Sequence, residues 1–185
     1  MGKTLRYTTV AIALHWVIAL LILFNLSVGF FMEGFARPLK NVIVPLHISS
    51  GITVLALTLL RIIWRLTHRP PPLPAGMAHW ERVSAHMAHA LLYVLMLAMT
   101  LTGWSIISAH PPNPRGGPML WGLVHLPPIS QIEPVAQKAA HERFVEWHSW
   151  AGWVLLGLLA LHICAALKHQ FIDRQSELAR MGLGR

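Results

Sequence analysis

The stretch WHSWAGWVLLGLLALH, residues 147–162, decides the fold, because it is apolar through its middle and carries an imidazole near each end. A run of this kind suits a membrane-spanning helix, in which the backbone satisfies its own hydrogen bonds. His148 and His162 are 14 residues apart. That spacing corresponds to about 21 Å along a helix and about 40° around its axis. One helix face therefore presents two imidazoles at two depths in the membrane.

The rest of the chain has the composition of a membrane protein. Of its 185 residues, 55% are hydrophobic and 12% are charged, whereas soluble domains have about 25% charged residues. Four apolar runs are each close to the length needed to cross a bilayer; they cover about 10–31, 42–66, 83–107 and 145–167. We therefore expect an all-α integral membrane four-helix bundle, with residues 1–185 forming a single domain.

The first run could instead be a signal peptide, since Lys3 and Arg6 precede it. Its length exceeds that of a usual signal-peptide core, and no clear Ala-x-Ala cleavage site follows it. A membrane-spanning helix is the better interpretation.

Basic residues indicate the orientation of the bundle. Ten lie on the side of the two termini, and five lie on the other side: Arg37, Lys40, Arg115, Lys138 and Arg143. The positive-inside rule then places both termini in the cytoplasm. The net charge of +8 is explained by this topology, so nucleic-acid binding is not expected.

The segment 108–142 is the longest connection and is expected on the outer side. It contains the apolar stretch MLWGLVHLPPI, so it is expected to lie against the membrane surface as a cap rather than to act as a plain linker. From about Pro134 the pattern becomes helical, which suggests that the fourth helix projects beyond the bilayer.

Each histidine of the 147–162 stretch has a counterpart at matching depth on another helix. His15 is at the depth of His162, near the cytoplasmic side, and His47 is at the depth of His148, near the outer side. Ionisable residues inside membrane helices are costly and usually functional. Two opposed neutral imidazoles suit the axial positions of a haem iron, which would leave electron transfer as its chemistry. Two such pairs predict two haems that form a conduit across the membrane.

Other interpretations remain open from the residues alone. A single histidine near a helix end is often only an interhelical hydrogen-bonding residue. His86 and His89 share one helix face at the cytoplasmic depth, so either could replace His15 or His162, or could bind a haem propionate or line a pocket. A metal transporter with histidine ligands would need acidic residues along its path, and these spans are nearly free of them. The single cysteine, Cys164, excludes the Cys-x-x-Cys-His attachment of a c-type haem.

Four stretches together resemble the bacterial cytochrome b561 family: IALHW at 12–16, PLHISSGITVLALTLLRIIWRLTHRPPP at 45–72, HMAHALLYVLMLAMTLTGW at 86–104 and EWHSWAGWVLLGLLALHICAALKH at 146–169. The family is related to the cytochrome b subunits of hydrogenases and formate dehydrogenases. The resemblance implies four helices and two b-type haems in the bacterial inner membrane. It also implies that His15, His47, His148 and His162 are the axial ligands.

Small stand-alone members of the family include superoxide oxidases. The resemblance implies electron transfer from superoxide, or another donor on the outer side, to membrane ubiquinone. His169 becomes a candidate quinone contact, with Lys168 and Asp173 available to assist proton uptake. The outer basic residues could steer superoxide, although nearby acids offset them. No catalytic residue is assigned. The alternative is a haem-bearing anchor subunit that passes electrons between a partner dehydrogenase or hydrogenase and quinone.

Overall fold

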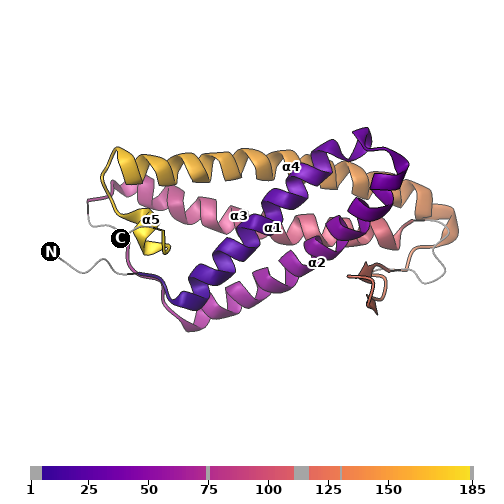
Figure 1. Cartoon of the computed structure of the whole chain (residues 1–185), viewed down its shortest axis with the longest axis horizontal. Coiled ribbons are helices and arrows are strands. Elements are labelled where there is room, and N and C mark those ends of the chain that lie inside the picture. The colour runs from indigo at the N-terminus through magenta and orange to yellow at the C-terminus, as the bar shows by residue number, and fades with distance from the viewer. Residues whose placement is uncertain (1–5, 74–75, 111–116, 130, 184–185) are drawn as a thin grey trace.

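The computed structural model describes residues 1–185 except 1–5, 74–75, 111–116, 130 and 184–185. Its helices and strands follow in the order α1, η1, α2, α3, β1, β2, α4 and α5 (Figure 1). The long helices are α1 (Thr9–Phe31), α2 (Arg37–Thr67), α3 (His79–Ser108) and α4 (Pro134–Phe171). All four are long and apolar enough to cross a membrane. The sequence-based prediction of four spanning helices is confirmed.

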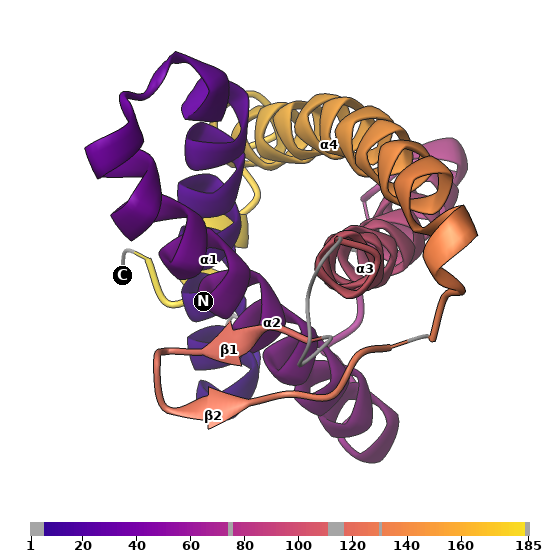
Figure 2. The ribbon, with the colours of Figure 1, turned by 90° about the vertical axis from the view of Figure 1, so that its right-hand side faces the viewer.

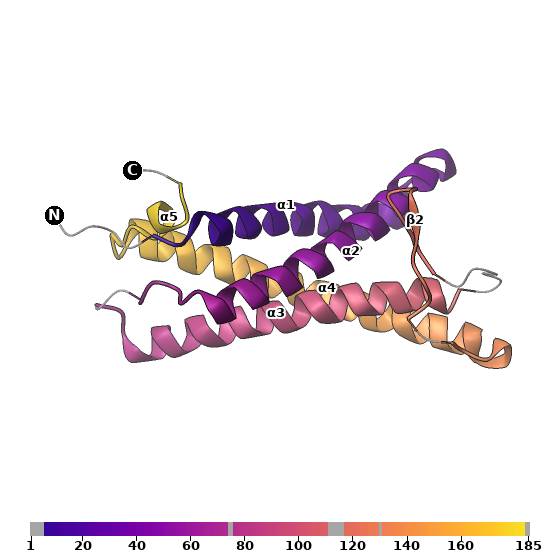
Figure 3. The ribbon, with the colours of Figure 1, turned by 90° about the horizontal axis from the view of Figure 1, so that it is seen from below.

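The four helices form a ring in chain order when the bundle is viewed end-on (Figure 2). The backbones of α1 and α2, of α2 and α3, and of α3 and α4 pack closely against one another. Figure 3 shows that α2 crosses the bundle obliquely and that α3 and α4 cross each other in this view, although these two helices pack closely. Side chains of α4 therefore face those of α1 and α2 across the interior of the ring.

The helices extend beyond the apolar runs that the sequence marks. α2 begins at Arg37 rather than near 42, and α4 begins at Pro134 rather than near 145. The loop expected over 108–142 therefore ends at Glu133. Hydropathy marks only the part of a helix that lies in lipid, whereas α4 has 38 residues, or about 57 Å at 1.5 Å per residue. Its charged first turns, which begin at Pro134, continue the helix beyond the apolar run, as the sequence pattern suggested.

Part of the outer connection forms a β-hairpin that lies on α2. β1 (Met119–Leu120) pairs antiparallel with β2 (Val124–His125). The backbone N–H of Trp121 donates to Ser49 Oγ at 2.9 Å, and the Trp121 indole donates to Thr53 Oγ1 at 3.3 Å. Because Ser49 is fully buried, the hairpin covers this part of α2. The expectation that the segment caps the bundle agrees with this packing.

The middle of the bundle is a mainly apolar layer between the two depths of histidines. Its buried side chains come from all four long helices: Ile18, Ile22, Leu26, Val54, Met96 and Leu155. Leu155 is only 3% exposed and lies halfway between His148 and His162 along α4. The packed layer therefore separates the two levels at which the imidazoles lie.

The C-terminal residues close the cytoplasmic end predicted from the charges. α5 (Glu177–Arg180) lies beside the start of α1, and Tyr7 N donates to Arg180 O at 3.2 Å. The Arg180 side chain is buried, pairs with Glu177 at 3.0 Å, and donates to the carbonyls of Pro71 and Pro72. One arginine thus ties the C-terminal segment to the connection between α2 and α3.

Arg180→Met is expected to loosen this closure. The variant leaves two carbonyl groups and one carboxylate without their donor, so the free energy of unfolding should fall by about 2 kcal/mol. Thermal melting of the purified protein in detergent measures the change. Arg174→Met, at an exposed position, is the control. Equal melting temperatures for the two variants would contradict the role given to Arg180.

Candidate functional site

The outer pair of histidines lies between α2 and α4. The ring centroids of His47 and His148 are 6.2 Å apart, with an interplanar angle of 77°. Both side chains are half-buried. Nδ1 of His47 is buried and has no hydrogen-bond partner among the described residues. His47 and His148, which the sequence places at the same depth, therefore lie next to each other in the structure.

A hydrogen bond sets the orientation of His148. Its Nδ1 lies 3.1 Å from Thr102 Oγ1. That hydroxyl has one hydrogen, which is directed to the carbonyls of Ala98 and Met99 at 2.7 and 3.0 Å. Nδ1–H of His148 therefore donates to Thr102, and Nε2 keeps a free lone pair. Metal-binding histidines commonly use their second nitrogen in this way.

The inner pair lies between α1 and α4. The ring centroids of His15 and His162 are 6.3 Å apart, with an interplanar angle of 65°. The Trp16 ring packs edge-on against His15 at 5.1 Å, and its indole donates to Met181 O at 2.9 Å. The C-terminal segment is thus linked to the helix turn that carries His15.

Both spacings fit one metal ion held between two imidazoles. An imidazole nitrogen binds a first-row metal such as zinc at about 2.0–2.1 Å and lies roughly 1.1 Å from its ring centre, so opposed rings have centres about 6.3 Å apart. The observed separations are 6.2 and 6.3 Å. The rings of each pair meet edge to face, at the far end of the range for such contacts. The donors present therefore suit a bis-imidazole metal centre at each level.

Two glycines keep space free beside the outer rings. A Cβ on Gly103 would lie 3.2 Å from Cε1 of His148, and a Cβ on Gly29 would lie 3.7 Å from Cε1 of His47. The first distance is too short for an ordinary contact, so a side chain at position 103 would displace the His148 ring. Gly103 belongs to the site because the imidazole packs against its backbone.

His89 is a third imidazole at the inner level. Its ring centroid is 5.4 Å from that of His162, closer than that of His15. His86 is exposed, and its Nδ1–H donates to Arg82 O of its own helix at 2.7 Å. The structure thus distinguishes the two histidines that the sequence left equivalent. His89 faces the inner pair, whereas His86 is held against its own backbone.

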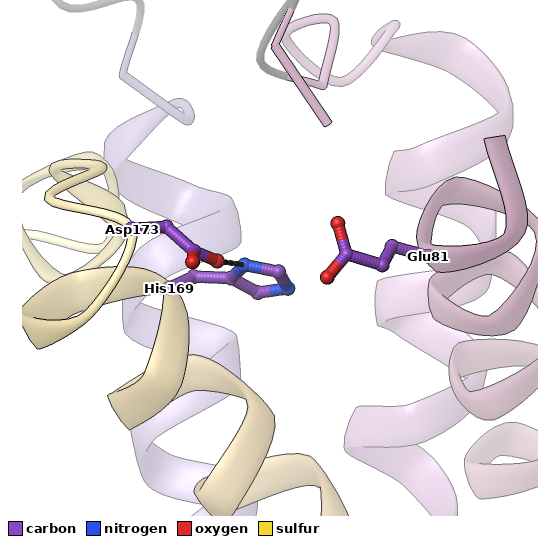
Figure 4. Close-up of side chains that lie close together, drawn as sticks. All are labelled: Glu81, His169 and Asp173. Carbon is purple, nitrogen blue, oxygen red and sulfur yellow. Dashed lines mark hydrogen bonds and ion pairs between the residues drawn. The ribbon is translucent and has the colours of Figure 1, made fainter. Parts of the chain in front are cut away.

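A polar cluster lies at the end of the bundle that carries both termini, where α3 and α4 meet. Lys168 Nζ is 2.6 Å from Glu81 Oε1 and 2.8 Å from Asp173 Oδ2, and His169 Nδ1 is 2.7 Å from the same Asp173 oxygen. In Figure 4 the other ring nitrogen of His169 points toward Glu81. One ligand atom each from Glu81, His169 and Asp173 lie within 4.8 Å of one another. Because the Lys168 ammonium is bonded to both carboxylates, it takes the place that a cation would occupy.

Glu81 is the member of this cluster that sequence reasoning missed. Its position in the first turn of α3, where its carboxylate accepts from Ala78 N at 3.2 Å, is that of a helix-capping residue. The only available signal was its place at the start of an apolar helix, at the end expected in the cytoplasm. Lys168, His169 and Asp173, which the sequence singled out, do come together.

Acidification is expected to weaken this cluster. Hydrogen bonds from Lys168 and then from His169 hold the pKa of Asp173 below its ordinary value of 3.8. A lowered pKa in the folded state stabilises the fold above the ordinary pKa, and this contribution is lost as pH falls through the folded value. The difference in melting temperature between the unmodified protein and Asp173→Asn should therefore be constant above pH 5 and should shrink below about pH 4. A difference that already changes near pH 6 would assign the effect to a histidine instead.

The outer basic residues do not form a single group in contact with the outer pair. Arg37, Lys138 and Arg143 are exposed, and Lys40 Nζ donates to Glu33 O at 3.1 Å. Arg115 lies outside the described residues. These side chains contribute charge at the outer end, from the starts of α2 and α4.

Comparison with known proteins gives similarities over nearly the whole chain. The family described as prokaryotic cytochrome b561 matches residues 6–184. Cytochrome b561 homolog 2 of Escherichia coli (strain K12) is 29% identical over 185 residues, which cover 95% of this chain and 90% of the relative. Cytochrome b562 of Cereibacter sphaeroides is 35% identical over 184 residues, covering 95% and 94%. Probable superoxide oxidase CybB of Yersinia pestis is 26% identical over 181 residues, covering 95% of each chain.

Proposed function

Since this chain belongs to the prokaryotic cytochrome b561 family, and is thus a multi-pass membrane cytochrome that transfers electrons by means of b-type haem, we propose that it holds two haems. His47 and His148 ligate the outer one, and His15 and His162 ligate the inner one. The observation that carries the proposal is the pair of centroid separations, 6.2 and 6.3 Å. Bound haem would supply reversible one-electron exchange, and with two imidazoles as ligands its iron would have no position left for a small ligand.

The protein's own groups orient and enclose the two centres. Thr102 fixes the ring of His148 through its hydroxyl. Gly103 leaves the His148 imidazole the space it needs. The apolar layer around Leu155 and Met96 excludes water between the two levels. Electrons would pass between the two levels through this layer.

The electron donor that we propose is superoxide at the outer end. Two superoxide anions each lose one electron and leave as dioxygen, and one ubiquinone takes up both electrons and two protons. The exposed cations Arg37, Lys138 and Arg143 raise the local concentration of a small anion. The relative whose name is probable superoxide oxidase CybB supports this choice of donor.

Quinone reduction is assigned to the cytoplasmic end, beside the Lys168–His169–Asp173 cluster. Nδ1 of His169 is engaged by Asp173 at 2.7 Å, which leaves the other ring nitrogen to meet a quinone oxygen. Protonated Lys168 and the Asp173 carboxylate connect that ring with the aqueous edge. These groups hold and relay protons, so uptake from the cytoplasm accompanies each reduction.

The orientation follows from the charges. Ten of the 15 basic residues belong to the end that carries both termini, so we place this end in the cytoplasm of a bacterial inner membrane. Superoxide is then consumed on the outer side, and the protons come from the inner side.

A second candidate is a haem-bearing anchor subunit for a partner dehydrogenase or hydrogenase. Its support is the exposed apolar surface at the outer end, where Leu123 is 85% exposed and Val135 is 93% exposed. A partner that covered these side chains would replace superoxide as the donor, and the haem ligands would be unchanged.

The visible spectrum of the purified chain tests the core of the proposal. We expect a sharp low-spin b-type alpha band on reduction and two haems per chain by pyridine haemochrome. Superoxide should then reduce the protein, and added ubiquinone should reoxidise it. A colourless protein would refute haem binding. Two haems with no response to superoxide would favour the anchor subunit.

A further inference from the structure

A cavity at the cytoplasmic end has no part in the proposed electron path. Its volume is about 360 Å³. It lies between the approach to α1 (residues 6–8), the last turns of α2, the proline-rich connection after α2, and α3. The imidazoles of the inner level, His15, His89 and His162, are not among its lining residues. The cavity therefore borders the inner level without being lined by its imidazoles.

The lining of the cavity is strongly basic. Four arginines, Arg6, Arg61, Arg65 and Arg69, contribute to it, and no acidic residue does. None of the four forms an ion pair with any acid in the described part of the chain. Such a concentration of uncompensated positive charge attracts a phosphate or carboxylate group.

Two of the walls are held rigidly. Arg61 Nε donates to Tyr93 Oη at 3.0 Å, which fixes the guanidinium of the deepest arginine. The Trp64 indole donates to Thr8 Oγ1 at 2.9 Å, and its ring stacks on His68 at 3.8 Å with an interplanar angle of 5°. A preformed wall lowers the ordering cost of binding.

The surroundings favour a lipid over a free anion. The last turns of α2 also carry Ile63 and Leu66, which are 59% and 81% exposed. In a membrane these side chains meet acyl chains, while Arg65 and Arg69 lie at the depth of the headgroups. Basic pockets between helices on the cytoplasmic side bind the headgroups of anionic lipids.

We propose that this cavity, lined by Arg6, Arg61, Arg65 and Arg69, binds the phosphate of an anionic phospholipid such as phosphatidylglycerol. The bound phosphate bridges the approach to α1, the end of α2 and the proline-rich connection. Its acyl chains lie along the exposed apolar face of α2. The lipid thereby holds together three segments at the cytoplasmic end.

The test uses the full-length protein in neutral detergent, depleted of lipid. Phosphatidylglycerol should raise its melting temperature, and phosphatidylcholine should not. In Arg65→Gln/Arg69→Gln, the phosphatidylglycerol concentration that gives half of the rise in melting temperature should increase about 30-fold. Each arginine near the membrane surface contributes roughly a factor of five to the affinity for an anionic lipid. Arg65→Lys/Arg69→Lys keeps both charges and should retain most of the response. If the glutamine variant does not fold, the comparison of the two lipids on the unmodified protein still tests the preference for an anionic lipid.

The matched control is Arg82→Gln/Arg174→Gln. It removes two charges from exposed positions at the same end but outside the cavity, so its response should equal that of the unmodified protein. Equal responses to the two lipids, or an unchanged response in Arg65→Gln/Arg69→Gln, would overturn the proposal. Stabilisation by inorganic phosphate alone would assign the site to a free anion and overturn it too. Loss of haem or a shifted midpoint potential in that variant, with lipid binding unchanged, would assign the arginines to haem carboxylates instead.

Discussion

His162→Ala is expected to leave the protein with one haem in place of two and to abolish electron transfer across the bundle. α4 contributes His162 to the inner pair. The centroid of its ring is 6.3 Å from that of His15. Mutation of a residue that only hydrogen-bonds a metal ligand already lowers metal affinity or activity about 10–100-fold. Superoxide-to-quinone turnover should therefore fall by at least ~100-fold, because the path to the cytoplasmic end is interrupted.

The remaining haem makes the result specific. In His162→Ala the outer pair, His47 and His148, is intact, so superoxide should still reduce one haem per chain. His148→Ala should lose the other haem and with it the response to superoxide. The control is His86→Ala, an exposed position on α3, which should keep both haems. Haem stoichiometry and stopped-flow reduction measure each case.

His89 provides an internal check of the ligand assignment. Its ring is nearer to His162 than that of His15 is, so a ligand pair of His89 and His162 is the competing arrangement. His15→Ala should lose the inner haem, while His89→Ala should keep it with a shifted midpoint potential. The reverse pattern would make His89 the ligand and would correct the pairing inferred from depth.

His169→Ala is expected to slow quinone reduction by about 100-fold, within the range for removal of a positioned proton donor or acceptor. Both haems should remain, and superoxide should reduce them at the normal rate. The ring bonds Asp173 at 2.7 Å, and the mutation removes the group that we place between the quinone and the aqueous edge. Reoxidation of the reduced protein by ubiquinone measures the step directly.

Two further variants separate a proton role from a structural one. Asp173→Asn keeps the size of the side chain and removes its charge, so it should slow reoxidation about tenfold and alter its pH profile. Gln170→Ala changes the next residue of α4, whose side chain accepts from Leu178 N of α5 and not from the cluster, and should leave reoxidation unchanged. If His169→Ala reoxidises normally, the quinone site lies elsewhere and the cluster only closes the end of the bundle.

The pattern of apolar runs was sufficient to predict the number of helices. In a bilayer every backbone group needs an internal partner, so an apolar run of sufficient length has few other options than a helix. The ends of α2 and α4 were not predictable in the same way. Outside lipid, a charged segment such as the one after Pro134 can be helical or can form a loop. Hydropathy does not distinguish these outcomes.

Depth along the helices is also readable from sequence, because the rise per residue is fixed. That is why the pairing of His47 with His148 and of His15 with His162 could be inferred before any coordinates. The direction in which a side chain points across the bundle cannot be inferred in the same way, because it depends on how each helix is rotated about its axis. His86 and His89 share one helix face by spacing, yet only His89 lies against His162.

By itself, then, the sequence determined four membrane helices, two levels of imidazoles and the basic end, since hydropathy, helical rise and charge are local properties. Only the tertiary structure decided the ring separations, the bond between Thr102 and His148, the part of Glu81 in the cytoplasmic cluster and the arginine-lined cavity. These features join residues far apart in the chain. Their distances come from the rotation and crossing of packed helices, which no single segment encodes.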